Sequence, residues 1–261
     1  MNLDLTGKTA VVCGSTQGIG WATALEMASL GASIVLVARD EEKLKACIAQ
    51  LPAPKAQVHQ YLVADFSHPQ QVESVINAFA EKNTAHILVN NTGGPNPGPA
   101  IEASVEAFRM AFNAHLICNQ LLAQALVPGM KQAGYGRIIN VISTSVKQPL
   151  PNLGVSNTIR GAVASWSKTL AMELGRFNIT VNNVLPGATQ TGRLEQIIQN
   201  KAQKAGMQAA DVSHEMAEEV PMKRLAEPHE IANAIAFLAS PAASYINGIN
   251  VPVDGGRTLC L

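Results

Sequence analysis

The chain of 261 residues has no excess of charge of either sign, because Lys plus Arg and Asp plus Glu each number 19. This balance offers no long-range attraction to nucleic acid or to an anionic membrane surface. The four cysteines, Cys13, Cys47, Cys118 and Cys260, form no CxxC pair and have no metal-ligand spacing. Such scattered cysteines suit a reducing compartment. We therefore expect no nucleic-acid partner, no membrane partner and no metal.

Long uninterrupted apolar segments are also missing. No stretch approaches the roughly 18 apolar residues of a transmembrane helix, and Asp4 and Lys8 stand where a secretory signal peptide needs an apolar run. These absences predict a cytoplasmic protein. With 47% hydrophobic residues the chain is nevertheless able to bury a full core, and we expect a single domain over residues 1–261.

Short apolar runs rich in β-branched residues alternate with longer helical patterns along the chain. The runs are 9–13, 33–38, 58–64, 86–90, 137–142, 179–185 and 249–253. Such runs, separated by segments long enough for crossover helices, are typical of a parallel sheet covered on both faces. The sequence therefore predicts an α/β fold, a doubly wound, Rossmann-like parallel sheet of about seven strands. The polar, helical segment 189–227 follows the sixth strand and is a possible substrate lid, because ligands bind at the carboxyl ends of such strands.

A glycine-rich turn, CGSTQGIG, follows the first predicted strand and leads into a helical pattern. It spaces Gly14, Gly18 and Gly20 as GxxxGxG. Glycine lets the backbone turn tightly and approach a pyrophosphate closely, and a helix N-terminus offers free N–H groups to an anion. The alternative is that these glycines serve only the turn itself.

Four motifs together resemble the classical short-chain dehydrogenase/reductase family, in particular its 3-oxoacyl-carrier-protein reductases. They are GSTQGIG, NNTGG at 90–94, NNVLPGATQT at 182–191 and VPVDGG at 251–256. The resemblance implies a nicotinamide dinucleotide cofactor. The residues it implies are Gly14, Ser15, Gly18, Ile19 and Gly20 for the pyrophosphate, Asp65 for the adenine, Asn91 and Gly93 for the adenosine ribose, and Pro186, Gly187 and Thr191 for the nicotinamide.

The end of the second predicted strand, VLVARDEE, bears on which nicotinamide cofactor is used. An acidic side chain there accepts a hydrogen bond from the ribose of NAD, whereas the 2′-phosphate of NADP requires a cation. Ala38 stands where the family often has Asp, and Arg39 follows. A guanidinium both pairs with phosphate and stacks on adenine, which favours NADP(H) over NAD(H). The alternative is that Arg39 pairs with Asp40 or Glu41 on the surface.

The resemblance also implies a reaction site, where this chain departs from the family. The family uses Ser to polarise the substrate oxygen, Tyr as the proton donor or acceptor, Lys four residues later, and a supporting Asn. Counted from GRII at 136–139, Ser143 is present, whereas Ser156 replaces Tyr and Arg160 replaces Lys. Serine cannot serve as that acid near neutral pH, and arginine stays protonated. Tyr135 and Tyr245 stand too far from this site to substitute.

His115 occupies the position of the family's Asn. Its ordinary pKa of about 6.5 lets it titrate near physiological pH and deliver protons to the site. The alternative is a histidine whose ring is satisfied within a packed helix. Asn113, two residues earlier, faces elsewhere on a regular helix and substitutes only if the helix is locally shifted.

Two functions fit these observations. The first is an NADP(H)-dependent oxidoreductase that transfers a hydride between nicotinamide and a small carbonyl or alcohol substrate, with the proton taken from solvent or through His115. The second is a nucleotide-binding protein of the same fold with little catalysis, acting as a sensor or assembly subunit. For either function, the resemblance implies a homodimer or homotetramer.

Overall fold

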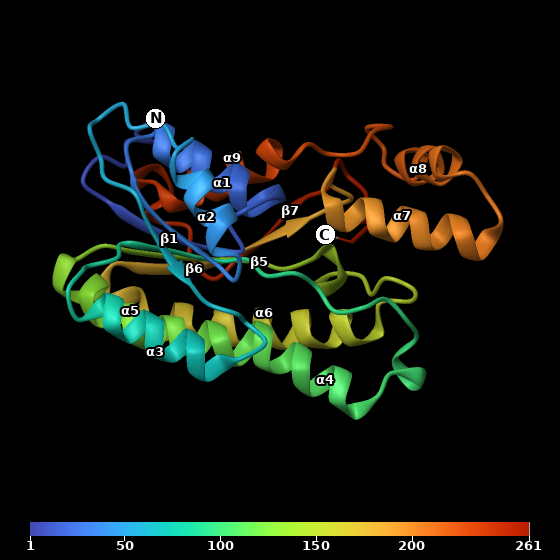
Figure 1. Cartoon of the computed structure of the whole chain (residues 1–261), viewed down its shortest axis with the longest axis horizontal. Coiled ribbons are helices and arrows are strands. Elements are labelled where there is room, and N and C mark those ends of the chain that lie inside the picture. The colour runs from blue at the N-terminus through green and yellow to red at the C-terminus, as the bar shows by residue number, and fades with distance from the viewer. Residues whose placement is uncertain (261) are drawn as a thin grey trace.

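The computed structural model describes residues 1–260, whose strands form one parallel sheet (Figure 1). In sheet order the strands are β3 (Gln60–Val63), β2 (Ser33–Ala38), β1 (Thr9–Cys13), β4 (Ile87–Asn90), β5 (Gly136–Val141), β6 (Ile179–Pro186) and β7 (Asn250–Val253). Every neighbouring pair is parallel. The direction of winding reverses between β1 and β4, which is the switch point where nucleotides bind in doubly wound sheets. The predicted fold class is confirmed.

Helices cover both faces of the sheet. α1 (Gly18–Ser29), α2 (Glu41–Ile48) and α9 (Pro228–Ala239) lie on one face, and α3 (Pro69–Ala80), α5 (Cys118–Ala133) and α6 (Gly154–Leu174) lie on the other (Figure 1). Val12 of β1 belongs to the first core together with Met27 and Ile235, whereas Val11 belongs to the second core together with Leu122. Because both faces of β1, β2, β4, β5 and β6 are buried, these strands have the continuous apolar sequences of a covered parallel sheet.

The segment after β6 forms a small helical unit of its own. It contains α7 (Gly192–Ala205) and α8 (Ala209–Glu218), which pack around Leu194, Ile198, Ala202 and Val212 (Figure 1). A bridge between Thr189 and Ala226 joins the two ends of this segment. The unit therefore starts where the predicted nicotinamide-binding residues end.

The connection between β4 and β5 carries helices on the side of the predicted reaction site. α4 (Val105–Phe112) runs into a π-helical turn (Asn113–Ile117), which continues as α5. Short 3-10 turns stand at Ala100–Glu102, Thr144–Val146, Gly175–Phe177 and Pro241–Ala243. Among the described residues, no helix is both long and apolar enough to cross a membrane.

The third strand is shorter than the sequence predicts, since β3 covers Gln60–Val63 rather than 58–64. It is an edge strand, and Val58 is 70% exposed. The imidazole Nδ1 of His59 accepts the hydrogen bond of the Ile34 N–H at 3.1 Å, so a side chain replaces a backbone carbonyl at the start of this pairing. The other predicted strands agree with the structure to within one residue at each end.

Candidate cofactor and reaction site

The glycine turn after β1 has the geometry of a phosphate cradle. Gly14 and Gly18 have φ angles of +59° and +55°, which favour glycine. A Cβ on Gly20 would lie 2.2 Å from the Gly14 carbonyl oxygen, so the turn is too tight for any side chain there. α1 begins without a side-chain cap and without an acidic residue in its first turn. Its first N–H groups are therefore available to an anion.

Three segments that are distant in the sequence meet at this turn. The Asn91 side chain, after β4, donates from Nδ2 to the carbonyl of Gly14 at 3.3 Å. Thr191, after β6, lies so close to Gly18 that a Cβ there would be 3.1 Å from its Cγ2. The segments that follow β1, β4 and β6 thus lie together at the carboxyl edge of the sheet, where a dinucleotide binds in such folds.

Two of the residues predicted for the pyrophosphate have side chains that face the core. Ser15 is fully buried, and its Oγ accepts the N–H of Val37 at 3.0 Å. Ile19 packs against the core on the α1 side of the sheet. Only the main chain of these two residues is placed to meet a phosphate.

The residues predicted for the nicotinamide stand at the end of β6. Pro186 is the last residue of β6 and pairs with Val253. A Cβ on Gly187 would lie 2.7 Å from the Cα of Asp254, so the tail segment VPVDGG packs directly on this glycine. Thr191 caps α7 through its Oγ1, which orients the start of the helical unit.

Arg39 is exposed at the end of β2. Its acidic neighbours have other partners: Asp40 accepts the N–H of Lys43 at 3.1 Å, and Glu41 pairs with Lys45 at 3.3 Å. Within residues 1–260, no ion pair of Arg39 forms within 4 Å. The alternative of a surface pair with Asp40 or Glu41 is therefore not found.

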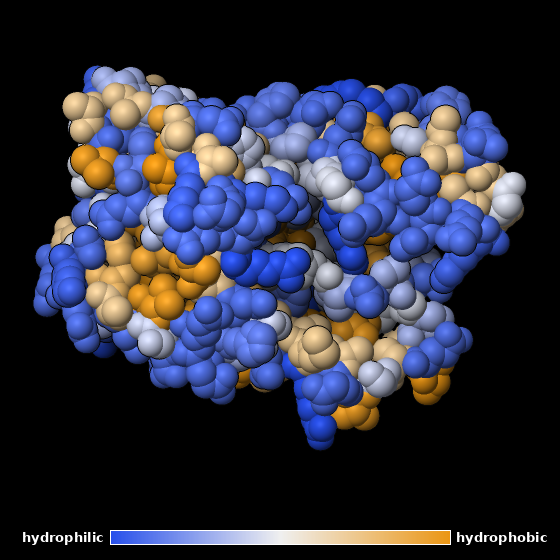
Figure 2. All heavy atoms as spheres, in the orientation of Figure 1, coloured by the Kyte–Doolittle hydropathy of each residue, from blue (hydrophilic) through white to orange (hydrophobic). Residues whose placement is uncertain are grey.

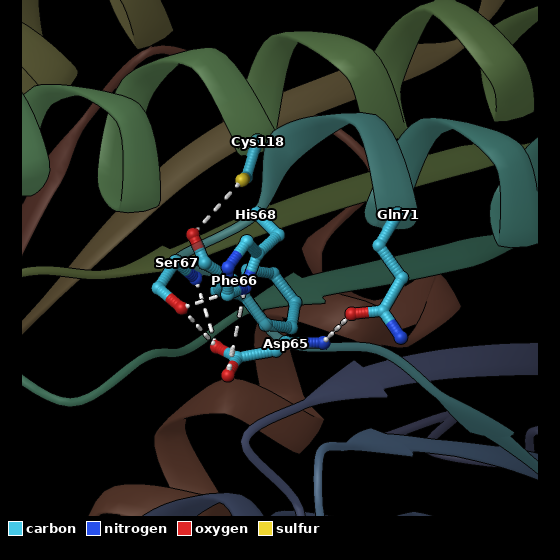
Figure 3. Close-up of polar contacts among 6 residues, drawn as sticks. All are labelled: Asp65, Phe66, Ser67, His68, Gln71 and Cys118. Carbon is cyan, nitrogen blue, oxygen red and sulfur yellow. Dashed lines mark hydrogen bonds and ion pairs between the residues drawn. The ribbon is translucent and has the colours of Figure 1, made fainter.

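Asp65 organises the loop between β3 and α3, as Figure 3 shows. Its carboxylate accepts hydrogen bonds from the Ser67 N–H at 2.9 Å and the Ser67 hydroxyl at 2.7 Å, and its own N–H donates to Gln71 at 3.0 Å. Burial raises the pKa of Asp65, but the bonds from Ser67 and the charges of His68 and Arg39 outweigh burial and lower it. Asp65 is thus ionised and lies in the electrostatic reach of Arg39.

Ser143 follows β5 at the carboxyl edge of the sheet. Its Oγ accepts the Ser145 N–H at 3.1 Å, and no acceptor among the described residues takes the Ser143 hydroxyl hydrogen. That hydrogen is free to point towards a substrate oxygen. Ser156 lies one turn before Arg160 on α6, as predicted, and its half-buried hydroxyl makes no hydrogen bond to the described residues.

Arg160 is buried beneath the carboxyl ends of β4 and β5, with 8% of its surface exposed. Its Nη1 donates to the carbonyl of Val141 at 3.1 Å, and its Nη2 donates to the carbonyl of Thr92 at 3.4 Å. Burial, and then the charge of Arg193, lower the pKa of Arg160 to about 10. The guanidinium therefore stays charged at neutral pH.

His115 lies in the π-helical turn and is 2% exposed. Its Nδ1 is 2.6 Å from the hydroxyl of Thr92. Burial, and then the charge of Arg160, hold the pKa of His115 well below its ordinary value. The expectation that it titrates near physiological pH is therefore wrong, because a second positive charge is disfavoured in this interior. Asn113 remains exposed in spite of the π-helical turn.

Tyr135 and Tyr245 form no hydrogen bond to the candidate site residues. Tyr135 precedes β5, at the opposite end of the strand from Ser143, and its hydroxyl donates to the Ala239 carbonyl at 2.6 Å. Tyr245 is fully exposed.

Sequence reasoning missed two residues of the site. Thr92 links His115, through its hydroxyl, to Arg160, through its carbonyl. Arg193 of α7 donates to the carbonyl of Pro95. The available signals were a hydroxyl residue within NNTGG and a cation in the first turn of a predicted helix, where the helix dipole disfavours it.

Two cavities flank the loop 93–98 that follows β4. One, of about 610 Å³, is lined by Gly93, Pro95, His115 and Val155, among others. The other, of about 650 Å³, is lined by Asn96, Pro97 and Arg193, among others. The described residues contain no group of three or more His, Cys, Asp or Glu side chains arranged to hold a metal ion.

A sequence profile described as Enoyl-(Acyl carrier protein) reductase matches residues 14–258. The chain belongs to the short-chain dehydrogenase/reductase family. A chloroplastic tropinone reductase homolog of Arabidopsis thaliana is 32% identical to this short-chain dehydrogenase/reductase over 257 residues, which cover 98% of this chain and 77% of the relative. The NADPH-dependent reductase BacG of Bacillus subtilis is 29% identical over 254 residues, covering 97% of this chain and 98% of the relative.

The solved structure of L-sorbose reductase from Gluconobacter frateurii, complexed with NADPH and L-sorbose, is similar over 100% of both chains, with a TM-score of 0.93 and 34% identity. All three of these relatives are named for reductases. The prediction of an oxidoreductase is thereby confirmed, and the comparisons give no support to the nucleotide-binding protein without catalysis.

Proposed function

We propose that this short-chain dehydrogenase/reductase is an NADP(H)-dependent enzyme that interconverts a small carbonyl compound and its alcohol. The observation that carries the proposal is the placement of Ser143 and Arg160. Arg160 binds the carbonyl of Val141, two residues before Ser143, at the same sheet edge as the uncapped N-terminus of α1. NADPH is bound in the L-sorbose reductase structure, and BacG is named NADPH-dependent.

The residues present fit such a cofactor. The glycine turn and the free N–H groups of α1 would hold the pyrophosphate. Arg39, which has no ion pair among the described residues, would hold the 2′-phosphate, with Asp65 beside the adenine. Asn91 and Gly93 would line the adenosine ribose, and the segment from Pro186 to Thr191 would enclose the nicotinamide. When bound, the nicotinamide supplies or accepts the hydride.

Ser143 and Arg160 act on the substrate oxygen in this proposal. Ser143 donates its free hydroxyl hydrogen to the carbonyl oxygen. Arg160 provides a fixed positive potential that favours the alkoxide formed when the carbonyl carbon receives the hydride. Both effects are preorganised, since Ser143 is held by Ser145 and Arg160 by two carbonyls.

Water delivers the proton that converts the alkoxide into the alcohol. Ser156 is not acidic enough, Arg160 stays charged, and His115 is neutral. The Ser156 hydroxyl is placed to hold this water, and His115 positions Thr92, whose carbonyl holds Arg160. The loss of one general acid typically slows such a reaction by about 10²- to 10⁴-fold.

Single-turnover oxidation of NADPH tests this function. The panel contains 3-oxoacyl thioesters, small ketones and ketoses, the last because L-sorbose reductase is a relative. We expect at least one panel member to be reduced, more slowly after Ser143→Ala although NADPH still binds, and NADPH to bind more tightly than NADH. Tight NADPH binding without reduction of any panel member contradicts the proposal.

The protein is proposed to assemble as a homodimer or homotetramer. Figure 2 shows hydrophobic side chains gathered over α4 and the turn before it. Ile101, Val105 and Met110 of this region are 94%, 67% and 58% exposed. Residues of this kind are usually buried in an interface when they gather in a patch. Light scattering after gel filtration should give two or four chains, and a monomer would contradict the assembly.

Two further assignments accompany the function. The protein is proposed to act in the cytoplasm, in keeping with its free cysteines. Fractionation of cells that express the tagged chain tests this location. The helical unit over 189–227 is proposed to be a substrate lid, and proteolysis within it should slow when NADP⁺ and substrate are bound.

A further inference from the structure

Two arginines near the predicted reaction site, Arg160 and Arg193, have no acidic partner among the described residues. Arg160 is buried, and among the described residues its guanidinium donates hydrogen bonds to the carbonyls of Val141 and Thr92. Arg193 is half-buried, donates to the carbonyl of Pro95, and has its Nη2 3.9 Å from the position of a Cβ on Gly94. Among residues 1–260, no carboxylate lies within 4 Å of either guanidinium.

Burial of these two positive charges destabilises the folded protein. Burial lowers the pKa of both groups, and the charge of Arg193 lowers that of Arg160 further. Arg193 also stands in the first turn of α7, where the helix dipole disfavours a cation. Glu195 lies in the same turn and lines the same cavity, but it forms no ion pair with Arg193. Among the described residues, backbone carbonyls accept hydrogen bonds from both guanidinium groups, but no carboxylate pairs with either.

The cavity that Arg193 lines is separate from the pyrophosphate cradle. The cradle follows β1, and Thr191 is the residue after β6 that contacts it. Arg193 reaches instead to the loop 93–98, and both cavities beside that loop are lined by residues other than the glycine turn. An anion that pairs with Arg193 there lies beside the loop 93–98, away from the glycine turn.

We propose that the substrate is a small oxo acid whose carboxylate, remote from the reacting carbonyl, pairs with Arg193. The planar fork of a guanidinium matches the two oxygens of a carboxylate. Arg160, which is buried and within the electrostatic reach of Arg193, adds positive potential without leaving its two carbonyl partners. This inference rests on the proposed function, since it names the substrate class of the same reductase site.

Calorimetric titration of the NADP⁺-loaded enzyme tests the inference without requiring turnover. The probes are 3-, 4- and 5-oxo acids, each paired with its methyl ester, which removes the charge and keeps the ketone. At least one acid should bind about tenfold more tightly than its ester, a difference of about 1.4 kcal/mol. Arg193→Met should reduce this preference to about twofold or less, and Arg193→Lys should retain part of it.

Lys204→Met is the matched control, because it removes a positive charge from the exposed end of the same helix, outside both cavities. Its acid preference should equal that of the wild type. The inference is overturned if no acid binds more tightly than its ester, or if Arg193→Met keeps the preference. It is also overturned if Arg193→Met weakens only NADP⁺ binding, since the arginine then serves the cofactor. Failure of NADP⁺ to bind the wild type would instead refute the proposed function.

Discussion

Replacement of Arg160 by methionine should stabilise the cofactor-free protein while it lowers activity. The pKa of this buried group is lowered to about 10, first by burial and then by the charge of Arg193. Since one pKa unit corresponds to about 1.4 kcal/mol, the charge costs the folded state roughly 3 kcal/mol. Methionine removes that cost but leaves the carbonyls of Val141 and Thr92 without this donor, at roughly 1 kcal/mol each. The expected net gain is about 1 kcal/mol.

The sign of this effect follows from protonation. Below about pH 10 the group is charged in both folded and unfolded states, so the cost is present in full. Above that pH the folded state releases the proton first, and the cost shrinks. At neutral pH, a gain of this size should raise the melting temperature by roughly 2–4 °C for a chain of this length.

Thermal unfolding of the wild type, Arg160→Met and Arg160→Lys at pH 7 measures the effect. Lysine keeps the positive charge, so Arg160→Lys should show no gain. A melting temperature of Arg160→Met several degrees below that of the wild type would contradict this prediction, because it would mean that the buried charge is compensated in the free protein.

Three further predictions concern the cofactor and the titrating groups. Gly20→Ala should weaken NADPH binding by about 100-fold or more in a fluorescence titration, because the added Cβ would lie 2.2 Å from the Gly14 carbonyl oxygen. A Cβ on Gly161 would have no atom within 4 Å, so Gly161→Ala should bind NADPH normally. Arg39→Glu should weaken binding of NADPH by about tenfold or more and leave NADH unchanged; equal losses for both cofactors would contradict the assignment. Because the pKa of His115 is lowered in the folded state, the free energy of unfolding should fall as the pH drops below about 6.5. His115→Gln should weaken this pH dependence. A pH dependence that is the same in wild type and variant would contradict the prediction.

The sheet was predictable because its signal is local. Runs such as 33–38 are apolar at every position, and this pattern requires burial on both faces. The exception, β3, lies at the sheet edge, where His59 rather than the backbone accepts the Ile34 N–H. An apolar run in the sequence does not show where a side chain replaces a backbone carbonyl as the hydrogen-bond acceptor.

The positions of the candidate site residues in the fold were predictable, whereas the contacts of their side chains were not. Ser143, Ser156 and Arg160 stand where motif counting places them. The state of His115 depends on its contact with Thr92, 23 residues away, and on the charge of Arg160. Arg193 reaches Pro95 across 98 residues. Such contacts arise only when the loops after β4, β5 and β6 are brought together, so no local pattern discloses them.

We propose above that the chain performs hydride transfer without a side-chain acid. The most direct measurement is a single turnover with NADPH deuterated at the transferred position of C4, in ordinary water, followed by mass spectrometry and NMR of the alcohol. We expect deuterium on the carbinol carbon and a pH–rate profile whose shape is unchanged by His115→Gln. Product whose carbinol carbon carries only hydrogen would contradict it.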